Sequence, residues 1–546
     1  MRQPGECVQR LELQRNWRLC SVRGPKKSRN ACLMEASKSD HEASGNGEDK
    51  AAAVTDEEPC IGTHTERQVG TAGTQPEQTD QNGASSGGSP DTGTPLSAYG
   101  LHVPDIAERL AKALSLRSTA AGTDASTALS EQQLRLEHQA PEAPPQQQRH
   151  QHRFWSSQPV PQYNETCVTC DGPIDERPRL DPASVPEAPY PLLAGFSWCE
   201  LDISAESDIQ ELYELLRSNY VEDDDAQFRF DYSPAFLRWA LSPPGWKRVW
   251  HVGVRVSTSS KLVAFIAAVP VTMRLRDVKA LAVVEVNFLC IHKRLRHKRL
   301  APVLIREITR RAHRQGIYQA VYTAGTLLPR PLVTCRYWHR SLDARKLIEC
   351  GFSRLRPRMT MKLTERLYAL PEKPLHPDVM PLERRHCASA RALLSQYLET
   401  HTKFHPCFSE TEFEHWFLPR DDVIYSFVRV QRNTSATGTS NERVTDLISF
   451  YSLPSSVIHS SKHRTLRAAY SFYNVATSCS FQDLMQDALI LAKNAGFDVF
   501  NALHLMENRE VFDQLKFAPG DGELHYYVYN WRTSVLRCEE NGLVML

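Results

Sequence analysis

The clearest pattern of hydrophobic and polar positions lies between residues 283 and 323. Residues 283–291 form an apolar run bounded by charge, which predicts a buried strand. A loop, 292–299, follows with seven basic residues out of eight. Pro302 suits the first turn of a helix, and Gly316 suits its end. The next apolar run, 317–322, predicts a second strand, so we expect the order strand, basic loop, helix, strand. The apolar face of this helix comprises Val303, Leu304, Ile305, Ile308 and Ala312.

Similar patterns predict the other elements of the chain. Helices are predicted at 209–220, with Leu212, Leu215 and Leu216 inward, and at 481–495, with Leu484, Met485, Ala488, Leu489 and Ala492 inward. Strands are predicted at 262–271, 281–291, 423–430, 447–453, 497–503 and 526–531. We expect a polar loop at 431–443 and a proline-rich linker at 368–381. The order helix, glycine, strand occurs twice, at Gly316 and Gly496, which suggests two related α/β halves, although this order is common in proteins.

The basic loop lies directly before a helix N-terminus, and this arrangement predicts an anion site. The first backbone N–H groups of a helix have no partner within it, and the helix dipole is positive at that end. Arg296, Lys298 and Arg299 add positive charge. A solvated basic surface and a nucleic-acid patch are the alternatives that this pattern leaves open.

Composition divides the chain into two parts. Of the 546 residues, 1–150 are rich in Ser, Thr, Gly, Gln, Glu and Ala and poor in aromatics, which predicts disorder. Within them, 106–116 could form a short amphipathic helix for docking a partner. The formal net charge of +1 indicates no partner for the chain as a whole.

The fourteen cysteines are scattered along the chain, and Cys167 and Cys170 form its one Cys-x-x-Cys pair. A structural zinc site usually needs four ligands, so we expect reduced cysteines rather than zinc or redox use of this pair. No secretory signal is visible, and the longest uncharged apolar run, 262–273, is too short to span a bilayer. The cytoplasm is therefore the expected compartment.

Two long motifs carry a resemblance to a known family. Glu285-Val-Asn-Phe-Leu-Cys-Ile-His-Lys and Lys298-Arg-Leu-Ala-Pro-Val-Leu-Ile-Arg-Glu-Ile-Thr-Arg resemble the signature of protein N-myristoyltransferase. The resemblance recurs at Phe154-Trp155, Phe228-Arg-Phe-Asp-Tyr-Ser-Pro, Tyr337-Trp-His-Arg-Ser-Leu, Tyr470-Ser-Phe-Tyr-Asn-Val and Phe497-Asp-Val-Phe-Asn-Ala-Leu. It therefore covers roughly residues 153–546.

This resemblance implies an α/β (α+β) fold of two tandem acetyltransferase-like (GNAT) halves that form one saddle-shaped catalytic unit. The implied domains are a disordered extension over 1–150, an N-terminal half over 151–367 that binds myristoyl-CoA, and a C-terminal half over 368–546 that binds peptide. The C-terminal half would also place the C-terminal carboxylate in the active site.

The implied reaction moves myristate from myristoyl-CoA, a co-substrate, to the N-terminal glycine of a protein. No prosthetic group, no metal and no specific nucleic acid are implied. The expected partners are proteins or peptides of the G-x-x-x-[ST] type with basic residues downstream. The resemblance further implies a monomer in the cytoplasm whose N-terminal extension brings part of it to ribosomes or membranes.

The resemblance also implies which residues act. The myristoyl-CoA site would comprise Arg153, Phe154, Trp155, Leu289, Cys290, Ile291, Arg296, His297, Lys298, Arg299, Leu300 and Ala301. Plain core packing is the alternative for Phe154 and Trp155. Arg299 stands where the acetyltransferase pyrophosphate loop usually has glycine, so the general acetyltransferase match is weaker than the specific one.

For catalysis, the resemblance implies that the backbone N–H groups of Phe288 and Leu289 polarise the thioester carbonyl. Two such donors in one strand require a local bulge, and ordinary strand pairing is the alternative. The main-chain carboxylate of Leu546 would accept the glycine proton, and Asn287 and Thr323 would hold the amine and the terminus. The apolar end 542–546 could instead be a last strand packed in the core.

The peptide groove implied by the resemblance comprises Tyr220, Asp223, Asp225, Phe228, Tyr232, Tyr337, His339, Tyr470 and Asp521, together with Leu546. The acidic cluster 222–225 would attract basic residues of the peptide, or it is a solvated loop.

Three rival interpretations remain open from the sequence. The first is a covalent acyl-cysteine on Cys290. The second is another acyl-CoA transferase, such as an N-terminal acetyltransferase. The third is a non-catalytic module that binds acyl-CoA or nucleic acid.

Overall fold

The computed structural model describes residues 152–546 except 164, 166–170, 176–180, 224, 297 and 435–439. The expected extension 1–150, with its helix at 106–116, lies outside the described residues, as do the pair Cys167 and Cys170 and the predicted site residue His297. In the part of the chain that is described, no helix is both long enough and apolar enough to cross a bilayer.

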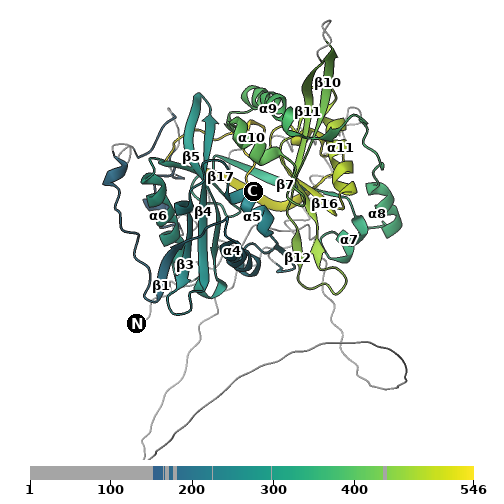
Figure 1. The fold of residues 1–546 in the computed structure, drawn as a ribbon. Helices are drawn as coiled ribbons and strands as arrows, with labels where there is room; N and C mark the ends of the chain where they lie inside the picture. The colour runs from purple at the N-terminus through teal and green to yellow at the C-terminus, as the bar shows by residue number, and fades with distance from the viewer. Residues whose placement is uncertain are drawn as a thin grey trace, which may run out of the picture. The chain divides into compact units, whose positions relative to one another are not determined.

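A single mixed sheet of 14 strands runs through the described residues (Figure 1). Its first region is built from β1 (Phe196–Glu200), β3 (His251–Val256), β4 (Leu262–Leu275), β5 (Val278–Ile291) and β6 (Gln319–Ala324). Helices α4 (Glu206–Asn219) and α5 (Pro234–Leu241) pack on one face of these strands, and α6 (Leu300–His313) packs on the other. Strand β4 is apolar throughout its first half because both of its faces are covered.

The second region repeats this organisation. Its strands are β8 (Met380–Pro381), β10 (Ile424–Thr434), β11 (Ser440–Ser452), β14 (Ala468–Ser471) and β16 (Val499–Leu503). Its helices are α9 (Cys387–His401), α10 (Glu410–Phe417), α11 (Phe481–Asn494) and α12 (Asn508–Val511). Two short strands attach to the sheet at its sides: β9 (Phe404–Pro406) pairs with β4, and β15 (Val475–Ala476) pairs with β11.

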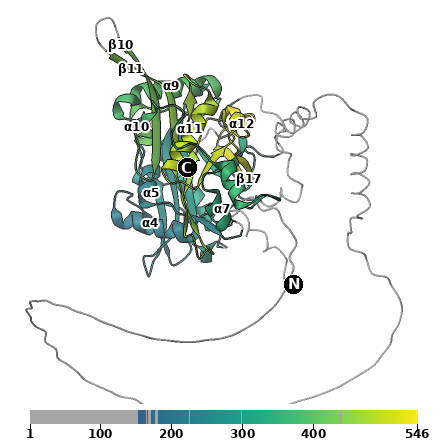
Figure 2. The same cartoon turned by 90° about the vertical axis from the view of Figure 1, so that its right-hand side faces the viewer.

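The two regions interlock through β7 (Val333–Ser341) and β17 (Ala518–Tyr529), since the strand order at the centre is β6-β17-β7-β16. A strand from near the C-terminus therefore lies inside the first region, and β7 pairs with β16 of the second. Helices α7 (Ala344–Glu349) and α8 (Met361–Tyr368) connect the regions, and a separate three-stranded sheet joins β2 (Phe228–Phe230) to β12 (Ser455–Val457) and β13 (Thr465–Leu466). Figures 1 and 2 both place the C-terminus among these central elements.

Most predicted elements are confirmed. Helices α4 and α11 bury the leucines predicted to face inward, and α6 buries Leu304, Ile308 and Ala312. The repeated order of helix, glycine and strand is also present in both regions. Gly316 and Gly496 adopt φ of 77° and 81°, and the next residues donate equivalent hydrogen bonds, Ile317 N–H to Ala312 O and Phe497 N–H to Ala492 O, each 3.1 Å.

The polar loop predicted at 431–443 is wrong in extent. Strand β10 continues to Thr434 and β11 begins at Ser440, with Gln431 paired to Arg443 and Arg432 paired to Glu442. The two strands form a ribbon that projects beyond the helices in Figure 1. Exposed residues such as Arg432, which forms an ion pair with Glu442 (3.0 Å), give this ribbon no hydrophobic alternation to detect.

Candidate active site

Strand β5 contains a bulge at the predicted oxyanion-binding residues. Cys290 pairs with Phe265 and Asn287 pairs with Ala267, so Phe288 and Leu289 together lie opposite Ile266 alone. Phe288 adopts a φ of 55°, which is uncommon for a bulky residue. Two residues against one is the arrangement of a β-bulge, which breaks the regular ladder and reorients local N–H groups.

The bulge lies just beyond the point where the sheet opens. Parallel pairing of β5 with β6 ends at Glu285 and Val321, whereas β6 continues beside β17 as far as Ala324. Beyond Glu285, β5 therefore leaves β6. The amide groups of the bulge lie at the edge of this opening rather than inside a closed ladder.

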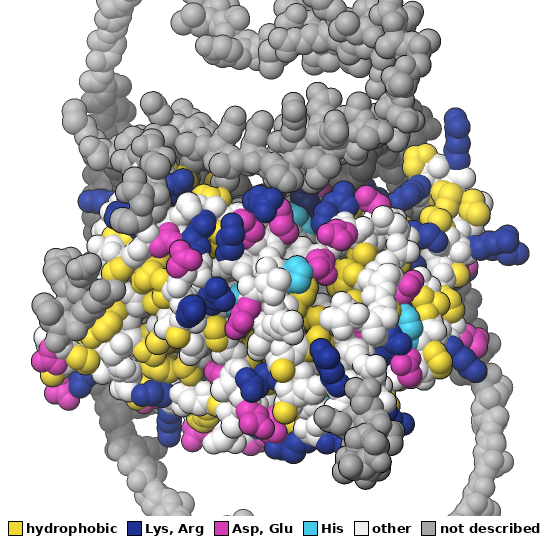
Figure 3. Space-filling view, turned by 90° about the horizontal axis from the view of Figure 1, so that it is seen from above, with side chains coloured by type: hydrophobic (Ala, Val, Ile, Leu, Met, Phe, Trp, Pro, Cys, Tyr) yellow, Lys and Arg dark blue, Asp and Glu magenta, His cyan; other side chains and the backbone are white. Residues whose placement is uncertain are grey.

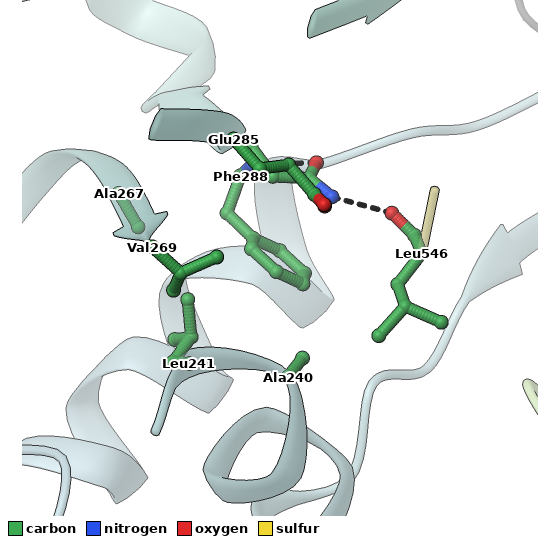
Figure 4. A pocket seen from close by; sticks show the side chains of 8 residues that line it. Ala240, Leu241, Ala267, Val269, Glu285, Phe288 and Leu546 are labelled. Atoms are coloured by element: carbon green, nitrogen blue, oxygen red, sulfur yellow. Dashed lines mark hydrogen bonds between the residues drawn. The ribbon is translucent and has the colours of Figure 1, made fainter. Parts of the chain in front are cut away.

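The C-terminus of the chain reaches this same place. The Asn287 side-chain amide donates to a main-chain oxygen of Leu546 at 2.5 Å, and the Phe288 N–H donates to Asn287 Oδ1 at 2.8 Å (Figure 4). Asn287 thus joins the bulge to the terminal carboxylate. Leu543, Val544 and Met545 are buried, whereas Leu546 is partly exposed.

Tyr473 and Gly542 hold the last residues in place. The Tyr473 hydroxyl donates to Gly542 O (3.0 Å) and accepts from the Val544 N–H (3.3 Å). A Cβ at Gly542 would lie 2.8 Å from Leu398 Cδ2 and 2.9 Å from Thr402 Oγ1, so a larger residue there would displace the terminal segment. The terminus is therefore packed, as its apolar sequence suggests, and its carboxylate is directed toward Asn287.

A cavity of about 220 Å³ lies beside the bulge and the C-terminus. Its walls are Ala240, Leu241, Ala267, Val269, Glu285, Asn287, Phe288 and Leu546 (Figure 4). Burial raises the pKa of Glu285 to about 7. We did not assign Glu285 a role from the sequence. A signal was present, however, because an acid two residues before Asn287 in an apolar strand shares its face.

Cys290 lies beside the bulge, but its thiol is buried. Burial raises the pKa of Cys290 to about 12, and its Sγ lies 4.0 Å from the backbone oxygen of Leu215. A thiol with so high a pKa is protonated at neutral pH and is a poor nucleophile.

The basic loop and the start of α6 divide into inward and outward residues. Arg296 points inward and donates to the backbone oxygens of Asn219 and Ile291, and burial lowers its pKa. Lys298 and Arg299 are exposed. Arg299 precedes α6 with a φ of 56°, the conformation that glycine adopts most easily, and no side chain caps the helix. Leu300 and Ala301 form the first turn of α6, where they are buried and partly buried.

Phe154 and Trp155 lie against the same helix and strand. Trp155 stacks on Tyr322 of β6, with ring centroids 5.4 Å apart and planes 8° apart. The Arg306 guanidinium of α6 lies 5.7 Å from the centre of the Phe154 ring. Arg153 is exposed beside them. The structure therefore brings 153–155 to the helix that follows the basic loop.

Several predicted peptide residues belong to an aromatic cluster next to the bulge. The rings of Tyr220 and Tyr232 lie 6.0 and 5.3 Å from the Phe288 ring. A cavity of about 350 Å³ follows, lined by Val221, Asp223, Phe228, Phe230, Phe352, Ser455, Leu466, Ala468, Tyr470 and Asn501. A cavity of about 250 Å³ is lined by Tyr337, Tyr451, Tyr470, Ser471, Asn501, Leu503, Leu505, Asn508 and Val544. His339 contacts Asn501 through a side-chain hydrogen bond of 2.6 Å.

The predicted acidic residues differ in their surroundings. Asp223 lines a cavity and accepts from the Phe228 N–H (2.7 Å), and burial raises its pKa. Asp225 and Asp521 are exposed. Glu222 instead forms ion pairs with Arg229 and Lys293, so it braces the basic loop.

Thr323 is a catalytic candidate that does not make the contact predicted for it. It pairs with Tyr526 in β17. Among the described residues it makes no hydrogen bond to Leu546. In the same part of the chain, no group of three or more His, Cys, Asp and Glu side chains is arranged to hold a metal ion.

Comparison with known proteins agrees with this geometry. Residues 173–335 match the family model of the N-terminal domain of myristoyl-CoA:protein N-myristoyltransferase, and 349–542 match its C-terminal domain. Glycylpeptide N-tetradecanoyltransferase 2 of Bos taurus is 51% identical over 399 residues, which cover 73% of this chain and 77% of the bovine one. The Drosophila melanogaster glycylpeptide N-tetradecanoyltransferase is 51% identical over 393 residues, 72% of this chain and 80% of its own.

A solved structure agrees as well. The crystal structure of Saccharomyces cerevisiae N-myristoyltransferase with bound myristoyl-CoA superposes with a TM-score of 0.67 and 40% identity, over 72% of this chain and 99% of the yeast chain. The mixed α/β fold, the bulged strand at the opening of the sheet and these relatives define an acyltransferase. More narrowly, the chain belongs to the myristoyl-CoA:protein N-myristoyltransferase family.

Proposed function

We propose that the chain transfers myristate from myristoyl-CoA to the N-terminal glycine of proteins, by direct attack of the amine on the thioester. The observation that carries this proposal is the contact of the terminal carboxylate of Leu546 with Asn287, beside the bulge at Phe288. It joins a candidate base to candidate oxyanion donors in one cavity. The names of the relatives and the ligand of the yeast structure support the choice of substrates.

The CoA moiety would bind where α6 begins. The free N–H groups of the first turn and the exposed Lys298 and Arg299 would hold the pyrophosphate. The site would be completed by Arg153, Phe154 and Trp155, which lie against α6 and β6, and by His297 of the loop. Arg296 would act indirectly, because its guanidinium braces the loop against Asn219.

The acyl chain would lie along β5 near residues 286–291, where Leu289 and Ile291 offer apolar surface and Cys290 is buried. Burial is worth about 0.8 kcal/mol per methylene, so a dozen methylenes would contribute on the order of 10 kcal/mol before ordering costs. This term can select chain length, because each missing methylene removes part of it.

The thioester carbonyl would be polarised by the N–H groups of Phe288 and Leu289. One such donor is typically worth about 3 kcal/mol in the transition state. The Phe288 N–H is bonded to Asn287 Oδ1 in this structure. The substrate oxygen would therefore take over this donor, and the Asn287 side chain would then be free to hold the incoming amine.

The carboxylate of Leu546 would take the proton from the glycine ammonium. In water an α-carboxyl has a pKa of about 3.5 and an α-amine about 7.8, so the carboxylate is ionised at neutral pH but is a weak base. Partial burial of the terminus would bring the two values closer together. The buried, protonated thiol of Cys290 argues against an acyl-cysteine intermediate.

The peptide would lie in the groove formed by Tyr220, Tyr232, Tyr337, His339 and Tyr470. Its glycine would point to Leu546, and its downstream Lys or Arg residues would meet Asp223, Asp225 and Asp521. Substrates of the G-x-x-x-[ST] type fit this proposal. The face shown in Figure 3 carries Lys and Arg interspersed with Asp and Glu rather than a continuous basic surface, which offers no support for nucleic-acid binding there.

The remaining features of the proposal rest on the family. They are a monomer in the cytoplasm, a CoA-binding half over 151–367, a peptide-binding half over 368–546, and an extension over 1–150 that brings the enzyme to ribosomes or membranes. Because β17 lies within the first region, we expect that neither half folds on its own.

One experiment tests the proposed function. Purified protein is given labelled myristoyl-CoA and a peptide that begins with glycine, or a matched peptide that begins with alanine. We expect transfer to the glycine peptide, slower transfer from shorter acyl-CoAs, and a loss of about a hundredfold or more when one glycine is appended after Leu546. Leu546→Ala is the matched control and should stay active, because it keeps the carboxylate in place.

Three results would contradict the proposal. Full turnover by the extended chain would exclude the terminal carboxylate as the base. Equal rates with acetyl-CoA and myristoyl-CoA would favour another acyl-CoA transferase, and RNA binding that weakens steeply with salt, without acyl transfer, would favour a binding module.

A further inference from the structure

Two cysteines meet where the C-terminal segment joins the sheet. Cys335 lies in β7 and is fully buried, and Cys538 begins the short helix η7 (Cys538–Glu540) and is partly exposed. Both are free thiols. The Cys538 thiol donates to the backbone oxygen of Thr334, the residue before Cys335, at 3.1 Å. Neither residue belongs to the proposed catalytic machinery.

Cys538 differs from the other described cysteines in its electrostatic surroundings. The hydrogen bond from Cys335 stabilises its thiolate, and the imidazole of His504 adds to this effect, so the pKa of Cys538 is lowered. Burial raises the pKa of each other described cysteine, namely Cys199, Cys290, Cys335, Cys350, Cys387, Cys407 and Cys479. The pair therefore joins a partly exposed thiol of lowered pKa to a fully buried one that can resolve it.

Asn541 connects this pair to the end of the chain. Its amide nitrogen lies 4.0 Å from Cys335 Sγ, and its Oδ1 accepts from the Leu543 N–H at 3.0 Å. Asn541 is fully buried, so it has little freedom to find other partners. Leu543 is three residues before the terminal carboxylate.

We propose that Cys335 and Cys538 form a peroxide-sensitive pair whose disulfide displaces the C-terminus and slows the enzyme. Closing an S–S bond draws Cys538 away from Thr334 and moves Cys335 Sγ, to which the Asn541 amide donates. The last residues then lose the support that presents Leu546 to Asn287. The effect on turnover rests on the proposed function, whereas formation of the disulfide does not.

The oxidation balances with a hydroperoxide as oxidant. The Cys538 thiolate attacks one oxygen of hydrogen peroxide, the O–O bond breaks, and the products are a sulfenic acid and hydroxide. The Cys335 sulfur then attacks the Cys538 sulfur, the S–O bond breaks, and the disulfide forms as the Cys335 proton leaves with the hydroxyl group as water. In total, two thiols and one hydrogen peroxide give one disulfide and two waters. A dithiol reverses the reaction by thiol–disulfide exchange.

The test compares full-length native protein with Cys538→Ser and with the matched control Cys407→Ser, which removes another partly exposed cysteine. Each is treated with hydrogen peroxide, remaining thiols are alkylated at low pH, and cross-linked peptides are identified by mass spectrometry. We expect a Cys335–Cys538 peptide in the native and Cys407→Ser proteins but not in Cys538→Ser. Turnover should fall roughly tenfold or more where the cross-link forms, and dithiothreitol should restore it.

Three results would overturn the proposal. The first is the absence of the cross-linked peptide in the native protein. The second is a complete cross-link with unchanged turnover. The third is an equal loss of turnover in Cys538→Ser. If untreated protein transferred no myristate at all, the proposed function would fail, while the cross-linked peptide would still report on the thiol pair.

Discussion

The two strand–helix–strand units of the molecule, β5-α6-β6 and β14-α11-β16, share a topology but treat negative charge in opposite ways. Each joins two parallel strands through one helix and ends that helix at a glycine of positive φ. Before α6 the loop is basic, and no side chain caps the helix. Before α11, Ser480 caps the helix and Asp483 occupies its first turn.

The loop before α11 is also already neutralised by the protein itself. The buried carboxylate of Asp446 accepts the N–H groups of Thr477 and Ser478, at 2.8 and 2.9 Å, and pairs with Arg429. Hydrogen bonds at Ser478 contribute most to keeping the pKa of Asp446 below its usual value despite burial. The second unit thus carries its own anion, whereas the loop before α6 in the first unit has exposed basic residues and no side-chain cap.

The units differ in their strands as well. Each parallel pairing is three residues long, but β5 bulges at Phe288 just after its pairing with β6 ends at Glu285, whereas β14 stays in regular register with β11 where its pairing with β16 ends at Tyr470. In the second unit, Tyr470 and Asn501, where the pairing of β14 with β16 ends, line two cavities.

The largest effect is expected at Asn287, beside the bulge of β5. Asn287→Leu removes both the bond to Leu546 and the bond to the Phe288 N–H, so kcat should fall by about 10²- to 10³-fold. KM for myristoyl-CoA should change little, because the proposed CoA site at the start of α6 does not include Asn287. Steady-state kinetics measures this. Asn501→Leu, in the second unit, is the matched variant and should act mainly on KM for the peptide. A fall in kcat equal to that of Asn287→Leu would mean that the two units do not differ in their effect on catalysis.

A second effect should appear at Asp446, the internal anion of the second unit. Asp446→Ala leaves the N–H groups of Thr477 and Ser478 without their acceptor and removes one of the two carboxylates that pair with Arg429, the other being Asp378, and should lower the free energy of unfolding by about 3 kcal/mol. Urea unfolding measures this change. At temperatures where the variant is folded, KM for myristoyl-CoA should match the native value, and a rise would show that this loop also serves the cofactor.

A smaller effect concerns Glu285 and pH. Its pKa is raised by burial from 4.5 to about 7, so the folded state loses stability as the pH rises from about 4.5 through 7, by at most about 3 kcal/mol. Glu285→Gln removes this loss. Its stability relative to the native protein should therefore be greater at pH 8 than at pH 5, as measured by urea unfolding at both values. An equal difference at the two pH values would mean that Glu285 ionises as it does in water.

The smallest effect is expected at the basic loop. Lys298→Gln with Arg299→Gly removes two positive charges while keeping the left-handed backbone at 299 accessible. KM for myristoyl-CoA should rise roughly tenfold at low salt, and the ratio should shrink as salt is added. Arg432→Gln, on the projecting ribbon, is the control for loss of surface charge. A similar rise in that variant would deny the loop a specific role.

Several elements were predictable because their signals are local. The apolar run of β5, the basic loop, Pro302 and Gly316 each act within a few residues, and the predicted order matches β5, α6 and β6. The bulge was expected from the family resemblance, and the register confirms its presence at Phe288 and Leu289. In contrast, the outer part of the β10–β11 ribbon, which falls in the predicted loop 431–443, was missed because its residues are polar.

Other features had no local signal. The insertion of β17 between β6 and β7 joins residues about two hundred positions apart. The inward turn of Arg296 depends on the Asn219 carbonyl, and the internal anion of the second unit depends on Asp446 reaching Thr477 from a neighbouring strand. Pattern identifies these side chains as charged but does not say which carbonyl or N–H they will meet.

By itself the sequence determined the local elements, the basic loop and the apolar character of the chain's end, because periodicity, proline and glycine act over one or two turns. The tertiary structure determined where β5 bulges and separates from β6. It also brought the last carboxylate into contact with Asn287, 259 residues earlier. Such a contact depends on the packing of Tyr473, Gly542 and the strands between, and its free energy is shared among all of them. No short stretch of sequence contains that information.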